Sequence, residues 1–251
     1  MEIDITGGRI FYTFPFDFPI LGKLQITETV VISWVVMAII TGLCIWLTHD
    51  LKVEQISKRQ ALAEWLVEKA NHFVLGNMGE EFRHLIPFVA ALFATSLVSN
   101  LISLVGLRSP TADLSTEAAW AVVVFIMITG QKIKTNGIGG YMKGFTEPIP
   151  VLTPFNILSE LATPISMACR HFGNILSGVV INTLVYGALA VASSALFGLI
   201  PGAVGDVLAK IPFLDVGIPA ILSVYFDWFS GFMQAFIFCM LTTMYIKGAA
   251  E

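Results

Sequence analysis

The stretch from Cys169 to Ile200 reads CRHFGNILSGVVINTLVYGALAVASSALFGLI, and its composition decides the fold. Arg170 is the only Asp, Glu, Lys or Arg between Glu160 and Asp206. An apolar run of this length can cross the hydrocarbon core of a membrane as a helix. An arginine at mid-bilayer costs about 3 kcal/mol by insertion measurements and cannot lose its proton to escape that cost. Arg170 is therefore a candidate functional residue, and the alternative is an arginine that reaches the interface or joins a structural ion pair.

The composition of the whole chain is that of a membrane protein. Of its 251 residues, 56% are apolar and 13% are charged, and the mean hydropathy is +0.80. Soluble domains carry about 25% charged residues. We therefore expect a single membrane domain, 1–251, without a separate soluble domain. The net charge of −4 is too small and too scattered to indicate a nucleic-acid partner.

Motifs for metal or nucleotide chemistry are not found in the sequence. Cys44, Cys169 and Cys239 lie in apolar segments, without the spacing of a metal site or a disulfide framework. The glycine-rich run GIGGYMKG at 137–144 lacks the spacing of a phosphate-binding loop and its following Ser or Thr. We expect no cofactor, no bound metal and no catalytic residue in this chain.

Apolar runs and polar breaks divide the chain into segments. The last two apolar runs would each be roughly 45 to 50 Å long as straight helices, against a hydrocarbon core of about 30 Å, so they must tilt strongly, bend or fold back. Between the first two spans, Leu62, Trp65 and Leu66 recur at helical spacing, which is typical of a surface helix. The sequence predicts an all-α integral membrane protein with about five membrane-embedded helices. The expected segments are an outer N-terminal segment (1–29), span one (30–48), an amphipathic cytoplasmic surface helix (54–75), a helical pair (85–107 and 114–134) and two long, strongly tilted helices (154–199 and 203–247).

The basic residues predict the topology. With the N-terminus outside, the inner loops and the C-terminus hold nine Lys and Arg residues, and the outer segments hold four. The positive-inside rule therefore favours an outside N-terminus and a cytoplasmic C-terminus. The chain length and the absence of a transit-type leader suggest a bacterial inner (plasma) membrane, and an organelle-encoded chain is the alternative. The third span begins near Leu114, which puts Glu117 just inside the membrane boundary.

Polar residues within the expected spans follow stripes at helical spacing. The stripes are Ser96, Ser99, Asn100 and Ser103 on one helix, Arg170, Asn174 and Gly178 on a second, and Ser223, Asp227, Ser230, Gly231 and Gln234 on a third. Such stripes indicate either interhelical hydrogen bonds with close packing or a path for ions. For Asp227 packing is the weaker interpretation, because a carboxylate in a membrane is costly and is a natural proton relay.

Three segments resemble one family. PISMACRHFGNILSG (164–178) resembles the arginine-containing signature of subunit a of F-type ATP synthases, in which the arginine faces the rotor ring. MQAFIFCMLTTMYI (233–246) resembles the last helix of that family, and SPTAD (109–113) resembles its outer loop. The three matches occur in the family's order along nearly the whole chain.

The resemblance implies a role for several residues. Arg170 matches the stator arginine, Asn174 the asparagine one turn later, and Gln234 the glutamine near the arginine. Many family members have a glutamate where this chain has Val179, and His or Glu where it has Asp227, so we expect Asp227 to supply the acid of the outer channel. Further candidates for channel lining are Ser99, Asn100, Ser103, Asp113, Glu160, His171 and Ser230.

His171 stands where the family usually has leucine. One interpretation is a residue on the ion path. The other, at least as well supported by the sequence, is a neutral imidazole that donates to the backbone or to a water at the lipid edge.

The resemblance also implies partners and a mechanism. It implies a ring of small c subunits that rotates past Arg170, the peripheral-stalk subunit b, the lipid bilayer and translocated H⁺ or Na⁺. Two offset half-channels would carry ions to and from the ring, and nucleotide chemistry would occur in other subunits. A secondary cation transporter is the alternative, although no inverted repeat is visible. A purely structural scaffold would leave Arg170 and Asp227 unexplained.

Overall fold

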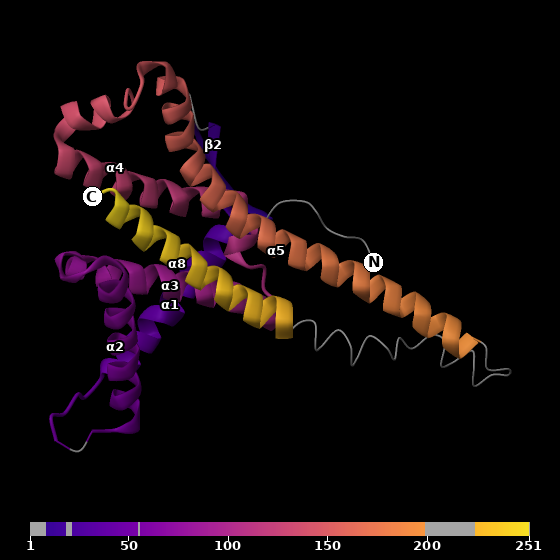
Figure 1. The fold of residues 1–251 in the computed structure, drawn as a ribbon. Helices are drawn as coiled ribbons and strands as arrows, with labels where there is room; N and C mark the ends of the chain where they lie inside the picture. Colours follow the sequence, from indigo (N-terminus) through magenta and orange to yellow (C-terminus); the bar gives the residue numbers. More distant parts are fainter. Residues whose placement is uncertain (1–8, 19–21, 55, 199–223, 251) are drawn as a thin grey trace.

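Five apolar helices dominate the computed structural model, which describes residues 9–18, 22–54, 56–198 and 224–250. These five segments are long and apolar enough to cross a membrane, and they confirm the expected all-α membrane architecture. α5 and α8 run obliquely beside each other, and α4 packs against α5 (Figure 1). The five helices are α1 (Glu28–Thr48), α3 (Ile86–Leu101), α4 (Leu114–Gly144), α5 (Thr153–Gly198) and α8 (Gly231–Gly248).

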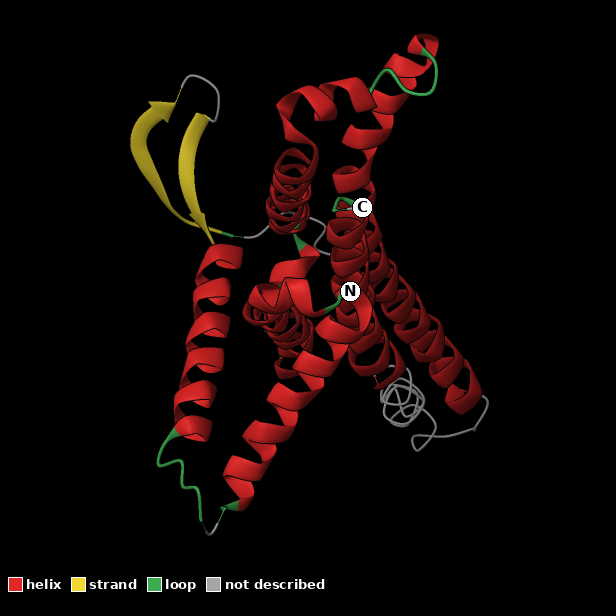
Figure 2. Cartoon of the chain, turned by 60° about the vertical axis from the view of Figure 1, so that its left-hand side comes forward, coloured by secondary structure: helices red, strands yellow, loops and turns green. Residues whose placement is uncertain are grey.

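A β-hairpin precedes α1 and was not expected within the outer segment 1–29. β1 (Ile10–Phe18) and β2 (Gly22–Thr27) pair antiparallel (Figure 2). The sequence of β1, IFYTFPFDF, is rich in aromatic and β-branched residues, which favour strands. The hairpin is an addition to a chain that is otherwise helical in its described part.

The polar segment after α1 forms a helix that projects from the bundle (Figures 1 and 2). This helix, α2 (Lys58–Met78), begins after Ser57, whose Oγ accepts from the backbone N–H of Gln60 at 3.2 Å. It ends at Gly79, whose φ of 96° favours glycine. A 3-10 segment (Glu80–Leu85) then leads into α3. The placement of this helix on the membrane surface stays a prediction.

The ends of α3 and α4 differ from the expected ranges, and glycines lie where the backbone changes direction near both ends. After α3 a 3-10 turn (Ile102–Val105) ends at Gly106, with a φ of 79°. α4 continues past the expected end at 134, but its helical geometry breaks at Gly137, with φ 68° and ψ 168°. Figure 1 shows the last part of α4 turning away from the first.

The structure describes nearly all of the first expected long segment, 154–199, but only part of the second, 203–247. α5 contains 46 residues, which corresponds to about 69 Å of helix and more than twice the hydrocarbon thickness. A strong tilt in the membrane is therefore expected and stays a prediction. Of the segment 203–247, residues 203–223 lie outside the described residues. The described part begins with a π-helical turn (Val224–Ser230) that leads into α8.

The hydrophobic core lies where α2, α3, α4, α5 and α8 meet. Phe238 of α8 is 2% exposed and lies among small or branched side chains. Around it the core members include Val74, Val89, Ala121, Val124, Ala168 and Cys239. Small residues at helix contacts let the backbones approach closely, as is usual in membrane bundles. α1 packs separately on α3 and the 3-10 turn after it, through Ile32, Val36 and Ile102.

Candidate functional site

Arg170 lies in the middle of α5 with its side chain exposed. On another side of the helix, Met167, Ala168 and His171 are buried against the bundle. Within the described residues, Arg170 forms no hydrogen bond or ion pair. The structural ion pair considered from the sequence is therefore not made by the described part of this chain, and the guanidinium is available to a group outside it.

Asn174, one turn after Arg170, connects α5 to α8. Its Nδ2 donates to Ser230 Oγ at 3.2 Å and to Gln234 Oε1 at 3.1 Å. Gln234 itself is only 5% exposed. The structure thus brings together Asn174, Ser230 and Gln234, which the sequence had placed on two separate stripes.

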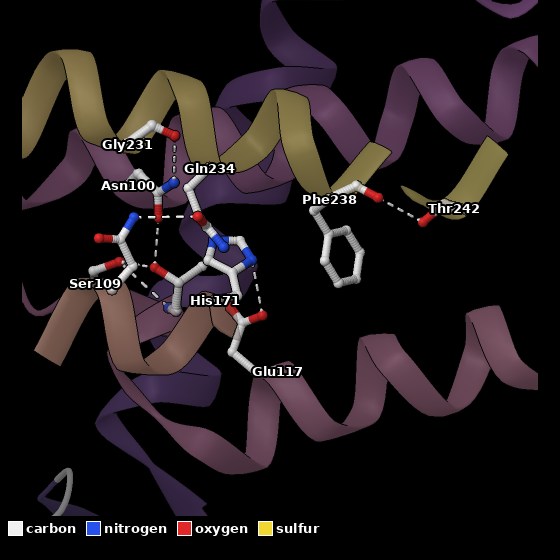
Figure 3. A network of polar contacts seen from close by, with 10 residues as sticks. Asn100, Ser109, Glu117, His171, Gly231, Gln234, Phe238 and Thr242 are labelled. Atoms are coloured by element: carbon white, nitrogen blue, oxygen red, sulfur yellow. Dashed lines mark hydrogen bonds and ion pairs between the residues drawn. The ribbon is translucent and has the colours of Figure 1, made fainter. Parts of the chain in front are cut away.

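Asn100 of α3 contacts α8 from the other side (Figure 3). Its Nδ2 donates to the carbonyl of Gly231 at 2.9 Å, and its Oδ1 accepts from Thr111 Oγ1 at 2.7 Å. Ser109 joins this network because its Oγ lies 2.6 Å from Thr111 Oγ1, and it also donates to the carbonyl of Ser99 at 2.6 Å. Both ends of the buried amide are therefore engaged, which favours interhelical packing as a role of Asn100.

Gly231 permits the close approach of α8 to Asn100. A Cβ at position 231 would lie 3.1 Å from Asn100 Cβ. We expect Gly231→Leu to lower the stability of the assembled protein by about 1–3 kcal/mol, as overpacking does. The thermal midpoint of the purified complex measures this. The control is Gly130→Leu, because Gly130 is exposed and has nothing within 4 Å of its virtual Cβ. Equal midpoints for the two variants would contradict the proposed tight contact.

Glu117 and His171 form a fully buried pair between α4 and α5 (Figure 3). His171 Nδ1 lies 3.0 Å from Glu117 Oε2, and both side chains are 0% exposed. The imidazole lies against the rings of Trp120 and Phe238, with centroids 6.3 and 5.6 Å away. Among the described residues, neither oxygen of Glu117 and neither ring nitrogen of His171 makes a hydrogen bond, so the 3.0 Å contact has the distance of an ion pair without hydrogen-bond geometry. Each residue stood out separately in the sequence but not as a pair, and the only signal was a carboxylate inside a span.

Glu160 lies ten residues before Arg170 on α5 and pairs with α4. Lys132 Nζ lies 2.6 Å from Glu160 Oε2 and 2.8 Å from Oε1. The two side chains are 31% and 17% exposed, so the pair is half-buried. They line a cleft of about 280 Å³. The other lining residues come from α4, α5 and the end of α8 and are Phe125, Ile128, Thr163, Met244, Tyr245, Gly248 and Ala249.

The remaining site candidates from the sequence are Ser99, Ser103, Asp113 and Asp227. Ser99 is buried, whereas Ser103 lies in the 3-10 turn beyond α3, where its Oγ donates to the carbonyl of Asn100 at 2.7 Å. Asp113 caps α4 by accepting from Ser115 N–H at 3.0 Å, and it accepts from the Thr29 hydroxyl at 3.2 Å. The backbone of Asp227 lies in the π-helical turn before α8. Its side chain is outside the described part.

The fold and the site define a class of protein. The chain is a helical membrane protein that presents an exposed arginine on a long apolar helix, next to a polar contact with a second helix. In its described part, no group of three or more His, Cys, Asp or Glu residues could hold a metal ion. This arrangement suits an embedded subunit that handles charge at a surface shared with another membrane component.

Comparisons with known proteins place the chain in a family. The family model of the ATP synthase A chain matches residues 30–247. The sodium-ion-specific ATP synthase subunit a of Propionigenium modestum is 29% identical over 98% of this chain and 86% of its own length. Subunit a 1 of Hahella chejuensis is 33% identical over 92% of this chain and 87% of its own length, and subunit a 1 of Chlorobaculum parvum is 32% identical over 92% and 91%. The chain belongs to the ATP synthase subunit a family.

Membership of the family confirms the resemblance drawn from the three sequence segments. The protein is an integral membrane component of an ATP synthase complex. The relatives named above are bacterial, which supports the bacterial plasma membrane as its location.

Proposed function

We propose that this chain is the ion-translocating stator subunit of its ATP synthase and catalyses no covalent step itself. The observation that carries the proposal is the exposed Arg170, which has no partner among the described residues, one helical turn from an amide that binds α8. An unpaired cation on an apolar helix face costs free energy in a membrane. A carboxylate on a neighbouring ring of c subunits would offset that cost each time it passes.

The electrostatics of this contact give the mechanism. A fixed guanidinium stabilises the ionised form of an approaching carboxyl group, so a ring site must release its ion before it passes Arg170. Because a guanidinium stays protonated, it cannot itself carry the proton across. Arg170 would therefore prevent a short circuit between two half-channels. Each elementary charge that crosses 100 mV releases about 2.3 kcal/mol, and the offset of the channels would convert this free energy into rotation.

The outer half-channel is proposed to approach the ring along the start of α8. Ser230 and Gln234 are joined to Asn174 there, and Asp227 precedes them in the π-helical turn. π-helical turns are frequent at functional sites. Asp227 would hand ions between the channel and the ring, with Ser99, Asn100, Ser103, Asp113 and His171 nearby as candidates for its lining. With the N-terminus outside, the start of α8 faces the outer side and its end faces the cytoplasm.

The inner half-channel is proposed to open through the cleft at Lys132 and Glu160. The cleft volume of about 280 Å³ is large enough for several waters, since each water occupies about 30 Å³ in the liquid. Polar groups of the two residues would hold such waters. The ion released from the ring would leave through this cleft into the cytoplasm.

Glu160→Gln tests the inner route. The change keeps the side-chain shape but removes the carboxylate that Lys132 binds at 2.6 Å. We expect ATP-driven ion uptake into inverted vesicles to fall by about two- to fivefold, less than for the residues beside the ring, because waters can still fill the cleft. Glu147→Gln is the control, since the Lys143–Glu147 pair is more than 60% exposed on both sides. Unchanged uptake in Glu160→Gln would remove Glu160 from the route.

The function as a whole is tested by ion uptake in vesicles that contain the complete complex, driven by ATP, with and without sodium. Uptake that depends on the ring and on this chain supports the stator function. Uptake by this chain without the ring would instead indicate the secondary cation transporter. The comparison of uptake with and without sodium identifies the ion that this complex carries. This measurement is needed because the name of the P. modestum relative specifies sodium only for that protein.

The peripheral-stalk subunit b is the expected partner on the stator side.

A further inference from the structure

The mechanism described above names His171 only as a candidate for channel lining and gives no role to Glu117 or to the contact between the two residues. Both side chains are 0% exposed, 3.0 Å apart and enclosed by the rings of Trp120 and Phe238. The pair joins α4 to α5 immediately next to Arg170 in the chain. Because His171 and Arg170 lie on the same helix, the pair can influence the direction of the Arg170 side chain through α5.

Stability alone does not explain such a pair. Replacing a buried ion pair with well-packed apolar residues is often neutral or stabilising, because desolvation of the two charges offsets their attraction. The two oxygens of Glu117 and the two ring nitrogens of His171 also make no hydrogen bond within the described residues, which adds to the cost of burial. The best-attested gain from a buried polar contact is a fixed register between two elements.

The rest of the buried face of α5 specifies its rotation weakly. Next to His171 that face consists of Met167 and Ala168, which are 3% and 4% exposed. A methionine adapts to several rotations and an alanine offers little to interlock. Pro164 lies inside the helix and cannot donate to the carbonyl of Glu160, which weakens the backbone there. The Lys132–Glu160 contact lies on the N-terminal side of Pro164, whereas Arg170 lies on its C-terminal side. This contact therefore fixes the direction of the Arg170 side chain less firmly.

Helix geometry links the direction of the two neighbouring side chains. At about 100° per residue, the buried side chains of Met167, Ala168 and His171 lie about 60 to 160° around the helix from Arg170. Anchoring His171 on α4 thus turns Arg170 to the exposed side. A rotation of α5 by about 100°, the angle between successive residues, would carry the guanidinium away from the exposed side.

We propose that Glu117 and His171 are positioning residues, whose contact fixes the rotation of α5 on α4 so that Arg170 faces the rotor ring. The inference rests on the proposed stator function and assigns a role that requires no ion to pass through the pair. The close contact between Glu117 and His171 would specify the rotation of α5, which the neighbouring Met167 and Ala168 specify only weakly.

Two variants of the complete complex separate this role from the alternatives. Glu117→Gln keeps the side-chain shape and an oxygen that can accept from His171. The double variant Glu117→Met with His171→Leu removes both polar partners and leaves no buried charge unpaired, so the subunit should still assemble. The matched control carries Glu81→Met and His72→Leu, the same changes at two exposed positions.

Disulfide cross-linking to the ring reads the rotation of α5 directly. Single cysteines are placed at Ser177, about 20° from Arg170 around the helix, or at Leu176, about 120° away, and both positions are exposed. A cysteine in the ring next to its carboxyl group is the partner. The exposed native thiols Cys44 and Cys169 are first replaced by serine.

In the otherwise unchanged complex, we expect the Ser177→Cys cross-link to exceed the Leu176→Cys cross-link by about tenfold. The double variant should lose this preference and most ATP synthesis, whereas Glu117→Gln and the exposed control should keep both. A preserved preference in the double variant would overturn the positioning role. So would severe loss of ion flux in Glu117→Gln with the preference intact, because the pair would then carry ions. No preference for Ser177→Cys in the unchanged complex would contradict the stator function itself.

Discussion

Arg170→Ala is expected to abolish ATP synthesis driven by an ion gradient while the complex still assembles. Removing the cation would let ring carboxyl groups pass this chain without releasing their ions, so the gradient would dissipate without turning the ring in one direction. Assembly should survive because Arg170 is exposed and makes no hydrogen bond or ion pair with the described residues of its own chain. ATP synthesis and the proton or sodium leak are measured in vesicles that contain equal amounts of complex.

Two further substitutions show whether the charge or the guanidinium geometry matters at this position. Arg170→Lys should not restore synthesis fully, since a buried ammonium is more readily neutralised and lacks the planar donor fork of arginine. Arg83→Ala is the control, because Arg83 and its partner Glu80 are both more than 70% exposed and exposed pairs contribute little. Normal synthesis in an assembled Arg170→Ala complex would refute the assignment of Arg170 as the stator residue.

Hydropathy predicted the membrane helices well because the lipid environment leaves few choices. Backbone groups inside a bilayer must be satisfied within the segment, so a long apolar run becomes a helix. Polar residues are rare in such runs, and Arg170 therefore stood out. Helical spacing placed Arg170 and Asn174 on one stripe, and the structure joins Asn174 to Gln234 on a second helix. Whether these residues carry ions stays a prediction.

Contacts between helices were harder to predict than features within one helix. Spacing along the chain cannot tell which face of α4 meets which face of α5, so Glu117 and His171 were noted separately but not as partners. The break at Gly137 and the turn after α3 depend on positive φ angles at glycines, which sequence spacing does not specify. The hairpin before α1 was missed because its aromatic residues were assigned only to an outer segment.

Asp227→Asn is expected to slow ion flux and ATP synthesis at least tenfold, which corresponds to about 1.4 kcal/mol in the limiting barrier. Asparagine keeps the shape and one acceptor oxygen of aspartate but cannot take up and release a proton. The backbone of Asp227 lies in the π-helical turn that leads into α8, seven residues before Gln234. The resemblance implies that Val179 stands where many members of the family carry a glutamate, so Asp227 is the acid expected to serve the outer half-channel.

The competing interpretation is that Asp227 only anchors the helix through hydrogen bonds, many of which asparagine could keep. Asp50→Asn is a suitable control, because Asp50 is exposed and its φ of 62° is a conformation that asparagine also adopts readily. Adding Val179→Asp to the Asp227→Asn chain should restore part of the flux, since it returns an acid to the position where many relatives carry one. Near-normal flux in Asp227→Asn alone would exclude the carboxylate from the ion path and leave Gln234, Asn174 and bound water to line the outer channel.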